Sequence, residues 1–222
     1  MAGRVGLITI GQSPRLDVVP EIKEVLGDSS VEILECGALD RLSREEIAEL
    51  VPREGEYALV TKLRDGSEVR VSRERILPLV QKCVDVLESL VDMLGLLCTG
   101  EFRELKSRKL LVMPSDLLLK VVESLKVSRL GVIVPDPTQA SPARRKWGLV
   151  APDIKIFSVS PYTGTLEELR KTSRELVDRD LIVLDCIGFG TEAKKVVATT
   201  SGKPVLVPRT LLAHVLKELS GV

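Results

Sequence analysis

Asparagine is absent from this chain of 222 residues, and glutamine occurs only at positions 12, 81 and 139. Charged residues, in contrast, make up 29% of the chain and consist of Asp, Glu, Lys and Arg. Few labile amides and many potential ion pairs are typical of proteins from hot environments. The composition therefore predicts a thermophilic source, and it says nothing about activity.

Aromatic residues are also scarce, at 3% of the chain, which argues against a platform for stacking nucleic-acid bases. The 32 basic and 32 acidic residues cancel, so no basic field would attract nucleic acid or an anionic membrane. No apolar run approaches the roughly 18 residues of a membrane span. The first residues lead directly into an apolar strand without a small-residue cleavage site, so we reject a signal peptide. We expect a cytoplasmic protein with neither nucleic acid nor membrane as a partner.

Cysteine and histidine are too few and too widely spaced for a zinc site. The cysteines are at positions 36, 83, 98 and 186, and the single histidine is His214. No P-loop, GxGxxG motif or Ser-His-Asp set is present either. We therefore expect no metal and no cofactor. In a cytoplasmic chain of this size, the four cysteines are expected to be free thiols.

Apolar residues account for 44% of the chain, which is typical of a globular protein. Residues 181–184 form a continuous apolar run, as in a strand buried on both faces of a parallel sheet. Cys186 follows this run, and residues 93–97 lead in the same way into Cys98. Ligands of open α/β sheets bind where strands end and helices begin, because free backbone N–H groups point there. The two cysteines therefore mark a candidate site.

Local signals predict the order of the remaining elements. Capping boxes at Ser43/Glu46 and Thr165/Glu168 predict two helix starts. Residues 57–62 and 68–71 flank Asp65-Gly66, which predicts a β-hairpin. Apolar periodicity predicts further helices at 72–91, from 114 onward and at 208–219. Strands are expected at 4–10, 31–36, 93–97, 110–113, 130–134, 154–159, 181–184 and 205–207.

The two halves of the chain look like an internal duplication. Residues 5–9 (Val-Gly-Leu-Ile-Thr) resemble 130–134 (Leu-Gly-Val-Ile-Val). The spacing from Gly6 to Cys98 exceeds that from Gly131 to Cys186 by 37 residues, the length of segment 37–73. We predict two related α/β lobes with mainly parallel sheets, the first carrying the hairpin as an insertion. The expected boundaries are 1–108 plus 203–222 for the first lobe and 109–202 for the second.

Cys98 and Cys186 are the candidate catalytic residues. A thiol between a strand end and a helix N-terminus can have a lowered pKa, and the thiolate is its reactive form. Two thiols on opposite sides of a small molecule would remove a proton from one face and return one to the other. We expect Cys186 to react first, because Glu101 opposes ionisation of Cys98. The alternative is that each cysteine merely packs a tight turn. Cys36, at a strand end, is expected to be structural, and Cys83 is expected to be a small buried apolar residue of a helix.

Other polar residues and glycines follow predicted strands and are candidates for binding a carboxylate. They are Ser13, Thr99, Gly100, Thr138, Gln139 and Gly188. The hydroxyl residues are explained equally well as helix caps or turn formers. Arg15 could clamp a carboxylate with two hydrogen bonds, or lie on the surface. Asp185 is a candidate for supporting Cys186 from behind, and His214 is expected to be structural.

Five motifs together resemble the AroM family. They are Ile-Thr-Ile-Gly-Gln-Ser-Pro-Arg (8–15), Cys-Gly-Ala-Leu-Asp (36–40), Leu-Leu-Cys-Thr-Gly-Glu-Phe (96–102), Lys-Trp (146–147) and Leu-Asp-Cys-Ile-Gly-Phe (184–189). That family is named for a genetic association with shikimate-pathway genes and is similar to the aspartate/glutamate racemase superfamily. The resemblance implies two pseudosymmetric α/β lobes, a cleft between them and one cysteine from each. The racemases typically carry Cys-Asn-Thr and Gly-Cys-Thr, whereas this chain has Cys98-Thr99-Gly100 and Asp185-Cys186-Ile187.

We therefore predict a cofactor-independent, racemase-like isomerase or lyase that acts on a small carboxylic acid between the lobes. The alternative is a non-catalytic protein that senses a small carboxylate metabolite in connection with aromatic amino-acid metabolism. A purely structural protein is disfavoured, because both cysteine turns would then be coincidental. The sequence leaves a homo-oligomer open.

Overall fold

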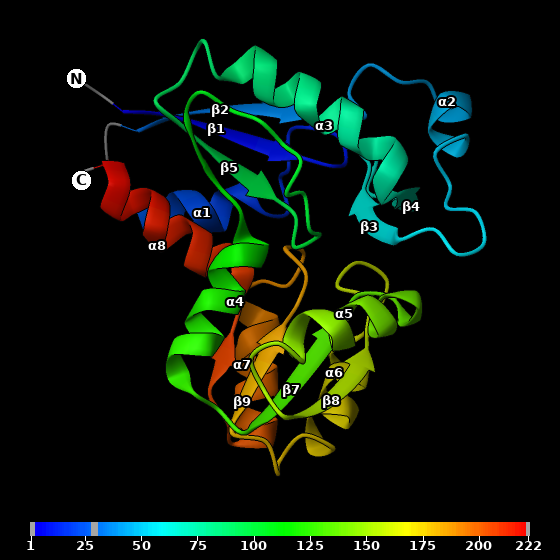
Figure 1. Cartoon of the computed structure of the whole chain (residues 1–222), viewed down its shortest axis with the longest axis vertical. Helices are drawn as coiled ribbons and strands as arrows, with labels where there is room; N and C mark the ends of the chain where they lie inside the picture. The colour runs from blue at the N-terminus through cyan, green and yellow to red at the C-terminus, as the bar shows by residue number, and fades with distance from the viewer. Residues whose placement is uncertain (1–2, 28–30, 221–222) are drawn as a thin grey trace.

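A computed structural model describes residues 3–27 and 31–220 of the chain. The outermost residues of the predicted first lobe, 1–2 and 221–222, lie outside the described residues. Two four-stranded parallel sheets each form the centre of a lobe, and an antiparallel hairpin lies between the lobes (Figure 1). The predicted two-lobed α/β fold is confirmed.

The two sheets have the same strand order. The first has the order β2-β1-β5-β6 and consists of β1 (Arg4–Thr9), β2 (Glu32–Gly37), β5 (Met93–Leu97) and β6 (Leu110–Val112). The second has the order β8-β7-β9-β10 and consists of β7 (Arg129–Val134), β8 (Asp153–Ser158), β9 (Leu181–Leu184) and β10 (Val205–Leu206). Each strand of the first sheet thus has a counterpart in the second, as a duplication requires.

Helices cover both faces of both sheets. They are α1 (Val19–Leu26), α2 (Arg44–Ala48), α3 (Arg73–Leu87), α4 (Pro114–Leu125), α5 (Ala140–Trp147), α6 (Leu166–Arg174), α7 (Thr191–Ser201) and α8 (Pro208–Ser220), with a 3₁₀ turn at Pro137–Gln139. Alternate strand residues pack on opposite faces: Leu96 packs toward α3, whereas Leu97 packs toward α1 and α8. In the second lobe Leu184 packs with α6 and α7, and Val183 with α4 and α5. Burial on both faces explains the continuous apolar strands.

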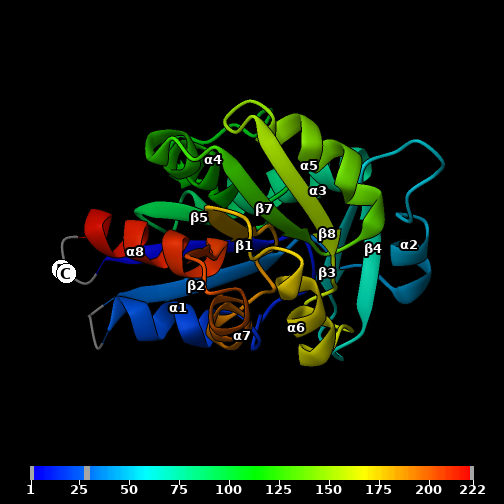
Figure 2. The same ribbon diagram turned by 90° about the horizontal axis from the view of Figure 1, so that it is seen from below.

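The lobes exchange helices. After β6 the chain enters α4, which packs Leu118 and Val122 against the second sheet. After β10 it returns through α8, which packs Leu212 and Leu216 against the first sheet and lies beside α1 (Figure 2). The last helix therefore packs on the first sheet.

The chain passes from one sheet to the other at different residues from the predicted lobe boundaries. Strand β6 lies after residue 108 yet pairs with β5, and β10 lies after residue 203 yet pairs with β9. The expectation that the last strand returns to the first lobe is therefore wrong, because its edge position completes the second sheet. We propose that the chain passes between the lobes at Met113 and at Val207.

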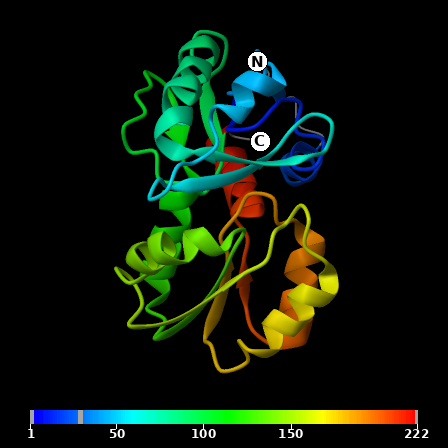
Figure 3. The same cartoon turned by 90° about the vertical axis from the view of Figure 1, so that its right-hand side faces the viewer.

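The predicted hairpin is present as β3 (Ala58–Lys62) and β4 (Glu68–Ser72). Its turn places Gly66 at φ 91°, a left-handed conformation that glycine adopts without strain. The hairpin is anchored to the first lobe by Gln12, whose N–H donates to the Lys62 carbonyl at 3.3 Å. Figure 3 shows it at the edge of the first lobe that faces the second. Arg70 of β4 forms an ion pair with Asp136 of the second lobe.

Cys36 and Cys83 form a disulfide across 47 positions of the chain. The expectation of four free thiols is therefore wrong. The reason is spatial: α3 packs over β2, which brings the two cysteines to a Cα–Cα distance of 5.6 Å. Only Cys98 and Cys186 are free. Within residues 3–27 and 31–220, no helix is long and apolar enough to cross a membrane.

Candidate functional site

Cys98 begins the turn that follows β5. Its Sγ accepts a hydrogen bond from the backbone N–H of Gly100 at 3.3 Å. A Cβ at Gly100 would lie 2.9 Å from a methyl carbon of Leu59 in the hairpin, so the turn has room only for glycine here. Cys98 is 7% exposed. The hairpin thus closes over the first cysteine turn.

Cys186 begins the corresponding turn after β9. The backbone N–H of Gly188 lowers the pKa of the Cys186 thiol, as the N–H of Gly100 lowers that of Cys98. A Cβ at Gly188 would lie 2.7 Å from Pro161 and from the ring of Tyr162. Cys186 is 5% exposed. The motif Cys-x-Gly therefore follows an equivalent strand in both lobes.

The structure brings the two cysteine turns together. The Thr99 hydroxyl donates to the Asp185 carbonyl at 3.0 Å, which joins the residue after Cys98 to the residue before Cys186. Negative charge on Cys98 also raises the pKa of Cys186. The two cysteine turns therefore lie side by side between the lobes.

Burial raises the pKa of the Cys98 thiol to about 11 and that of Cys186 to about 12. The glycine N–H groups act in the opposite direction, but they do not outweigh the loss of water around the sulfurs. The predicted lowering of the pKa is therefore wrong.

Arg15 is 2% exposed and lies between the lobes, so its alternative place on the surface is excluded. Its Nε and Nη2 donate to the Asp17 carboxylate at 2.8 and 2.9 Å, and Nη1 donates to the Thr9 hydroxyl at 2.8 Å. A third partner is the Tyr162 hydroxyl, 3.1 Å from Nη2. Burial opposes the charge, yet the Asp17 hydrogen bonds keep the Arg15 pKa above its usual value. The Arg15 charge lowers the pKa of both thiols.

Ser13 and Thr99 have their hydroxyls engaged by protein. The Ser13 hydroxyl and N–H donate to the two oxygens of Asp40 at 2.6 and 2.7 Å. Thr99 donates to Asp185, as described above. Both side chains hold turns in place here, as their alternative interpretation as turn formers suggested.

Thr138 and Gln139 lie in the 3₁₀ turn after β7. The Thr138 hydroxyl and N–H donate to Asp136 at 2.5 and 2.9 Å, and the Thr138 side chain is exposed. Gln139 is buried at 7% exposure, and its N–H donates to the Asp136 carbonyl at 3.0 Å. Asp136 in turn binds Arg70 of the hairpin. These contacts connect the turn to the hairpin, and no contact in the described residues joins it to the thiols.

A buried ion pair lies behind the cysteines. The sequence analysis named its residues but did not predict that they pair. Lys146 Nζ lies 3.1 and 3.2 Å from the two carboxylate oxygens of Asp185, and Trp147 Nε1 donates to the same carboxylate at 2.8 Å. Lys146 and Asp185 are 6% and 5% exposed. The Lys-Trp pair at 146–147 was the available signal, although its partner was not predictable.

Two tyrosines near the thiols were missed. Burial raises the pKa of Tyr57, and neighbouring Asp185 and Cys98 add to the effect. Burial likewise raises the pKa of Tyr162, with Cys186 adding to the effect. Both phenols are therefore neutral at ordinary pH. Tyr162 follows the predicted strand 154–159, so its position at a strand end was its only signal.

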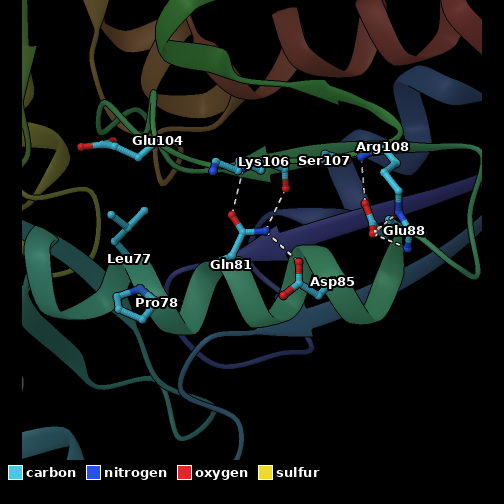
Figure 4. Close-up of a pocket in the computed structure, with 9 residues that line it drawn as sticks. All are labelled: Leu77, Pro78, Gln81, Asp85, Glu88, Glu104, Lys106, Ser107 and Arg108. Carbon is cyan, nitrogen blue, oxygen red and sulfur yellow. Dashed lines mark hydrogen bonds and ion pairs between the residues drawn. The ribbon is translucent and has the colours of Figure 1, made fainter.

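One cavity adjoins this site, and a second lies away from it on the first lobe. One of about 470 Å³, at the boundary of the lobes, is lined by Tyr57 and Lys146 among others and adjoins the buried ion pair. Another, of about 630 Å³, lies on the first lobe between α3 and the segment 104–108 (Figure 4). There Gln81 donates to Asp85 and to the Lys106 carbonyl, both at 2.8 Å, so polar groups of the wall satisfy one another. In the described part of the chain, no cluster of three or more His, Cys, Asp or Glu residues is arranged to hold a metal ion.

The fold belongs to a class of two-lobed α/β proteins that includes solved structures of two racemases and an isomerase. Allantoin racemase from Klebsiella pneumoniae has a TM-score of 0.62 at 14% identity, over 99% of this chain and 88% of that chain. The Picrophilus torridus aspartate racemase has a TM-score of 0.58 at 15% identity, over 99% and 95%. The maleate isomerase Iso from Pseudomonas putida S16 has a TM-score of 0.60 at 13% identity, over 100% and 94%. At these identities the likeness shows the fold alone.

Within this class, the chain belongs to the AroM family, whose model, described as AroM protein, matches residues 5–220. The resemblance inferred from the five motifs is thereby confirmed. A search of curated proteins finds no significant match.

Proposed function

We propose that this protein is a cofactor-independent, racemase-like isomerase or lyase that acts on a small carboxylic acid, with Cys98 and Cys186 as acid and base. The observation that carries the proposal is the meeting of two turns at the ends of equivalent strands, each with a free thiol and a glycine N–H that lowers the pKa of that thiol. Structural neighbours named as a racemase and an isomerase support the same class of chemistry.

The chemistry requires one thiolate and one thiol. The thiolate removes the hydrogen next to the carboxylate as a proton, and the C–H electron pair moves into the carboxylate as an enediolate. The thiol then gives its proton to the opposite face of that carbon and becomes the thiolate. Proximity of the two sulfurs favours this division, because charge on Cys98 raises the pKa of Cys186. The two cysteine side chains together therefore carry one negative charge.

Arg15 is the proposed contact for the substrate carboxylate, supported by its charge and by its effect on both thiols. The N–H groups of Gly100 and Gly188 are proposed to stabilise whichever cysteine is ionised. The other candidates, Ser13, Thr99, Thr138 and Gln139, are proposed to shape the surrounding loops, because the contacts of these turns are with protein.

A non-catalytic sensor is the second candidate, and the burial of both thiols favours it. Cys98 and Cys186 are nearly sealed from solvent and neutral at ordinary pH, as suits a closed binding protein. The ligand in this case would be a small carboxylate in connection with aromatic amino-acid metabolism.

Hydrogen exchange into a substrate separates these two functions. Aspartate, maleate, an arylmalonate and aromatic-pathway acids would first be screened by thermal shift, and each binder then incubated with the protein in deuterium oxide. For an enzyme we expect exchange of the hydrogen next to the carboxylate, slowed about 10²–10⁴-fold by Cys186→Ser or Cys98→Ser. A binder that never exchanges in the wild type, and still binds both variants, would support the sensor.

A further inference from the structure

The ion pair between Lys146 and Asp185 lies across the two cysteine turns. Lys146 Nζ is 3.1 Å from Asp185 Oδ1 and 3.5 Å from the carbonyl oxygen of Thr99. Thr99 follows Cys98, and Asp185 precedes Cys186. The cation therefore contacts both turns, while the carboxylate belongs to the second turn alone.

This placement gives the ion pair a direction. Its positive end touches the backbone of the first cysteine turn, and its negative end is attached to the residue beside Cys186. Trp147 fixes the direction, because its indole N–H holds the carboxylate at 2.8 Å and leaves the lysine on the side of Thr99. Consistent with this geometry, Lys146 lowers the pKa of Cys98, whereas Asp185 raises that of both thiols.

The other groups around the thiols do not supply the same distinction. Arg15 lowers the pKa of both. Each thiol also has one tyrosine nearby, Tyr57 beside Cys98 and Tyr162 beside Cys186, and both phenols are neutral. The charged groups beyond these contacts form pairs of their own or lie at the edge of the site: Asp17, Lys62, Arg73 and Glu101.

We propose that Lys146 is a positioning residue that gives the two cysteines unequal roles, with Cys98 as the thiol that loses its proton and Cys186 as the one that keeps it. The inference rests on the proposed function, since it assigns base and acid within the same reaction. Cys98 then takes the proton from carbon, and Cys186 delivers its own proton to the opposite face. The cycle closes when Cys98 releases the proton it gained to water and Cys186 regains one from water.

Titration of the cysteines in Lys146→Met tests the proposal without a substrate. Cysteine labelled with ¹³C at Cβ reports each thiol by NMR, and Cys36 and Cys83 do not titrate because they form the disulfide. The two signals are assigned with Cys98→Ser and Cys186→Ser. In the wild type we expect the Cys98 signal to begin to move at a lower pH than that of Cys186. In Lys146→Met the Cys98 signal moves later, and the Cys186 signal is nearly unchanged.

Alkylation by iodoacetamide, mapped by mass spectrometry at one alkaline pH, gives the same comparison as a rate. We expect the ratio of Cys98 to Cys186 labelling to fall about tenfold in Lys146→Met, as for a change of one pKa unit. Comparing variant with wild type cancels the difference in access between the two sulfurs. The matched control is Lys155→Met, which removes a second-lobe lysine paired with Asp178 at the surface and should leave the ratio unchanged.

Two further variants keep the test decisive if Lys146→Met does not fold. Lys146→Arg retains the charge and should retain the order of titration. Lys146→Met with Asp185→Asn removes both ends of the ion pair, and the two thiols should then titrate closer together. The proposal is overturned if a folded variant without the Lys146 charge keeps the wild-type order and margin, or if Cys186 titrates first in the wild type.

The outcome separates this inference from the proposed function. If the thiols titrate as expected but no acid exchanges its hydrogen, the effect of Lys146 stands and the catalytic function falls. If an acid exchanges and the Lys146 variants leave both thiols unchanged, the function stands and the assignment of roles falls.

Discussion

Leu97 and Asp185 occupy the same position in the two lobes, directly before a cysteine at the end of an equivalent strand. Leu97 packs into an apolar cluster with Leu212 and Leu216 of α8. Asp185 is as deeply buried but binds Lys146 and Trp147. The two turns share the pattern Cys-x-Gly, and the N–H of that glycine lowers the pKa of the thiol in each. The repeated fold therefore supplies the paired thiols, whereas single side chains behind the turns make them different.

A second difference between the lobes is that, within the described residues, two features occur in the first lobe alone. It has the disulfide between Cys36 and Cys83 and the hairpin that closes over Cys98. The second lobe meets the hairpin through Asp136 and Ser160 and has no cross-link of its own in those residues. The first lobe is thus covalently held and provides the cover, and the second provides the surface that the cover closes on.

Making the second turn resemble the first should have the largest effect on stability. Asp185→Leu leaves Lys146 buried without its partner, which costs about 3–5 kcal/mol of unfolding free energy. Combining it with Lys146→Met restores an apolar pair, and we expect most of the loss to be recovered. Urea unfolding of both variants measures this, and a double variant no more stable than the single one would contradict it.

Removing the cross-link of the first lobe should have the next largest effect. Cys36→Ala with Cys83→Ala, or reduction of the wild type, should lower the unfolding free energy by about 2–4 kcal/mol, since the disulfide restricts the unfolded chain. The double variant is its own control, because reductant should no longer change its unfolding midpoint. Equal midpoints for oxidised and reduced wild type would show that the cross-link adds no stability.

Alkaline pH should weaken the contact between the lobes, because both thiols ionise less readily when folded. The pKa of Cys98 rises from 9.0 to about 11 and that of Cys186 from 9.0 to about 12. The unfolded chain therefore loses these protons first, so the stabilisation is complete below pH 9 and is lost as the pH rises toward 12. We expect the double variant Cys98→Ala with Cys186→Ala to lose less unfolding free energy over this pH range. Tyr57 and Tyr162 act in the same direction above pH 10 and leave part of it in place.

Local features of the fold were predictable from the sequence. Both capping boxes form as expected, Ser43 with Glu46 and Thr165 with Glu168. The Asp65-Gly66 turn closes the hairpin with the expected strands. These features depend on residues three or four positions apart, so the chain itself contains the necessary information. The end of α3 shows the limit, since periodicity continues to Val91 but the helix ends at Leu87.

Features that depend on burial or on distant contacts were not predictable. The adjacency of the two cysteine turns was expected from the repeat, but the direction of the pKa shifts of Cys98 and Cys186 was not. That direction depends on how much water the hairpin and the opposite lobe remove, which no single sequence pattern reports. Arg15 is buried because Asp17 and Tyr162 satisfy its guanidinium, and Tyr162 is 147 positions away along the chain.

Removing the contact between the hairpin and the second lobe should have the smallest effect on global stability. It should nevertheless have a clear effect on local opening of the hairpin. Glu68 of β4 accepts from the hydroxyls of Ser160 and Thr163, in the turn that carries Tyr162. Glu68→Ala removes one half-buried set of hydrogen bonds, which costs about 0.5–1.5 kcal/mol. The hairpin should nevertheless open more often, and alkylation of Cys98 in the native protein should accelerate, because Leu59 of the hairpin packs on its turn. Glu192→Ala on α7 is the matched control, since that exposed residue lies away from the hairpin. Hydrogen exchange of the β3 and β4 amides measures the opening, and protection equal to that of the wild type would show that Glu68 does not hold the cover closed.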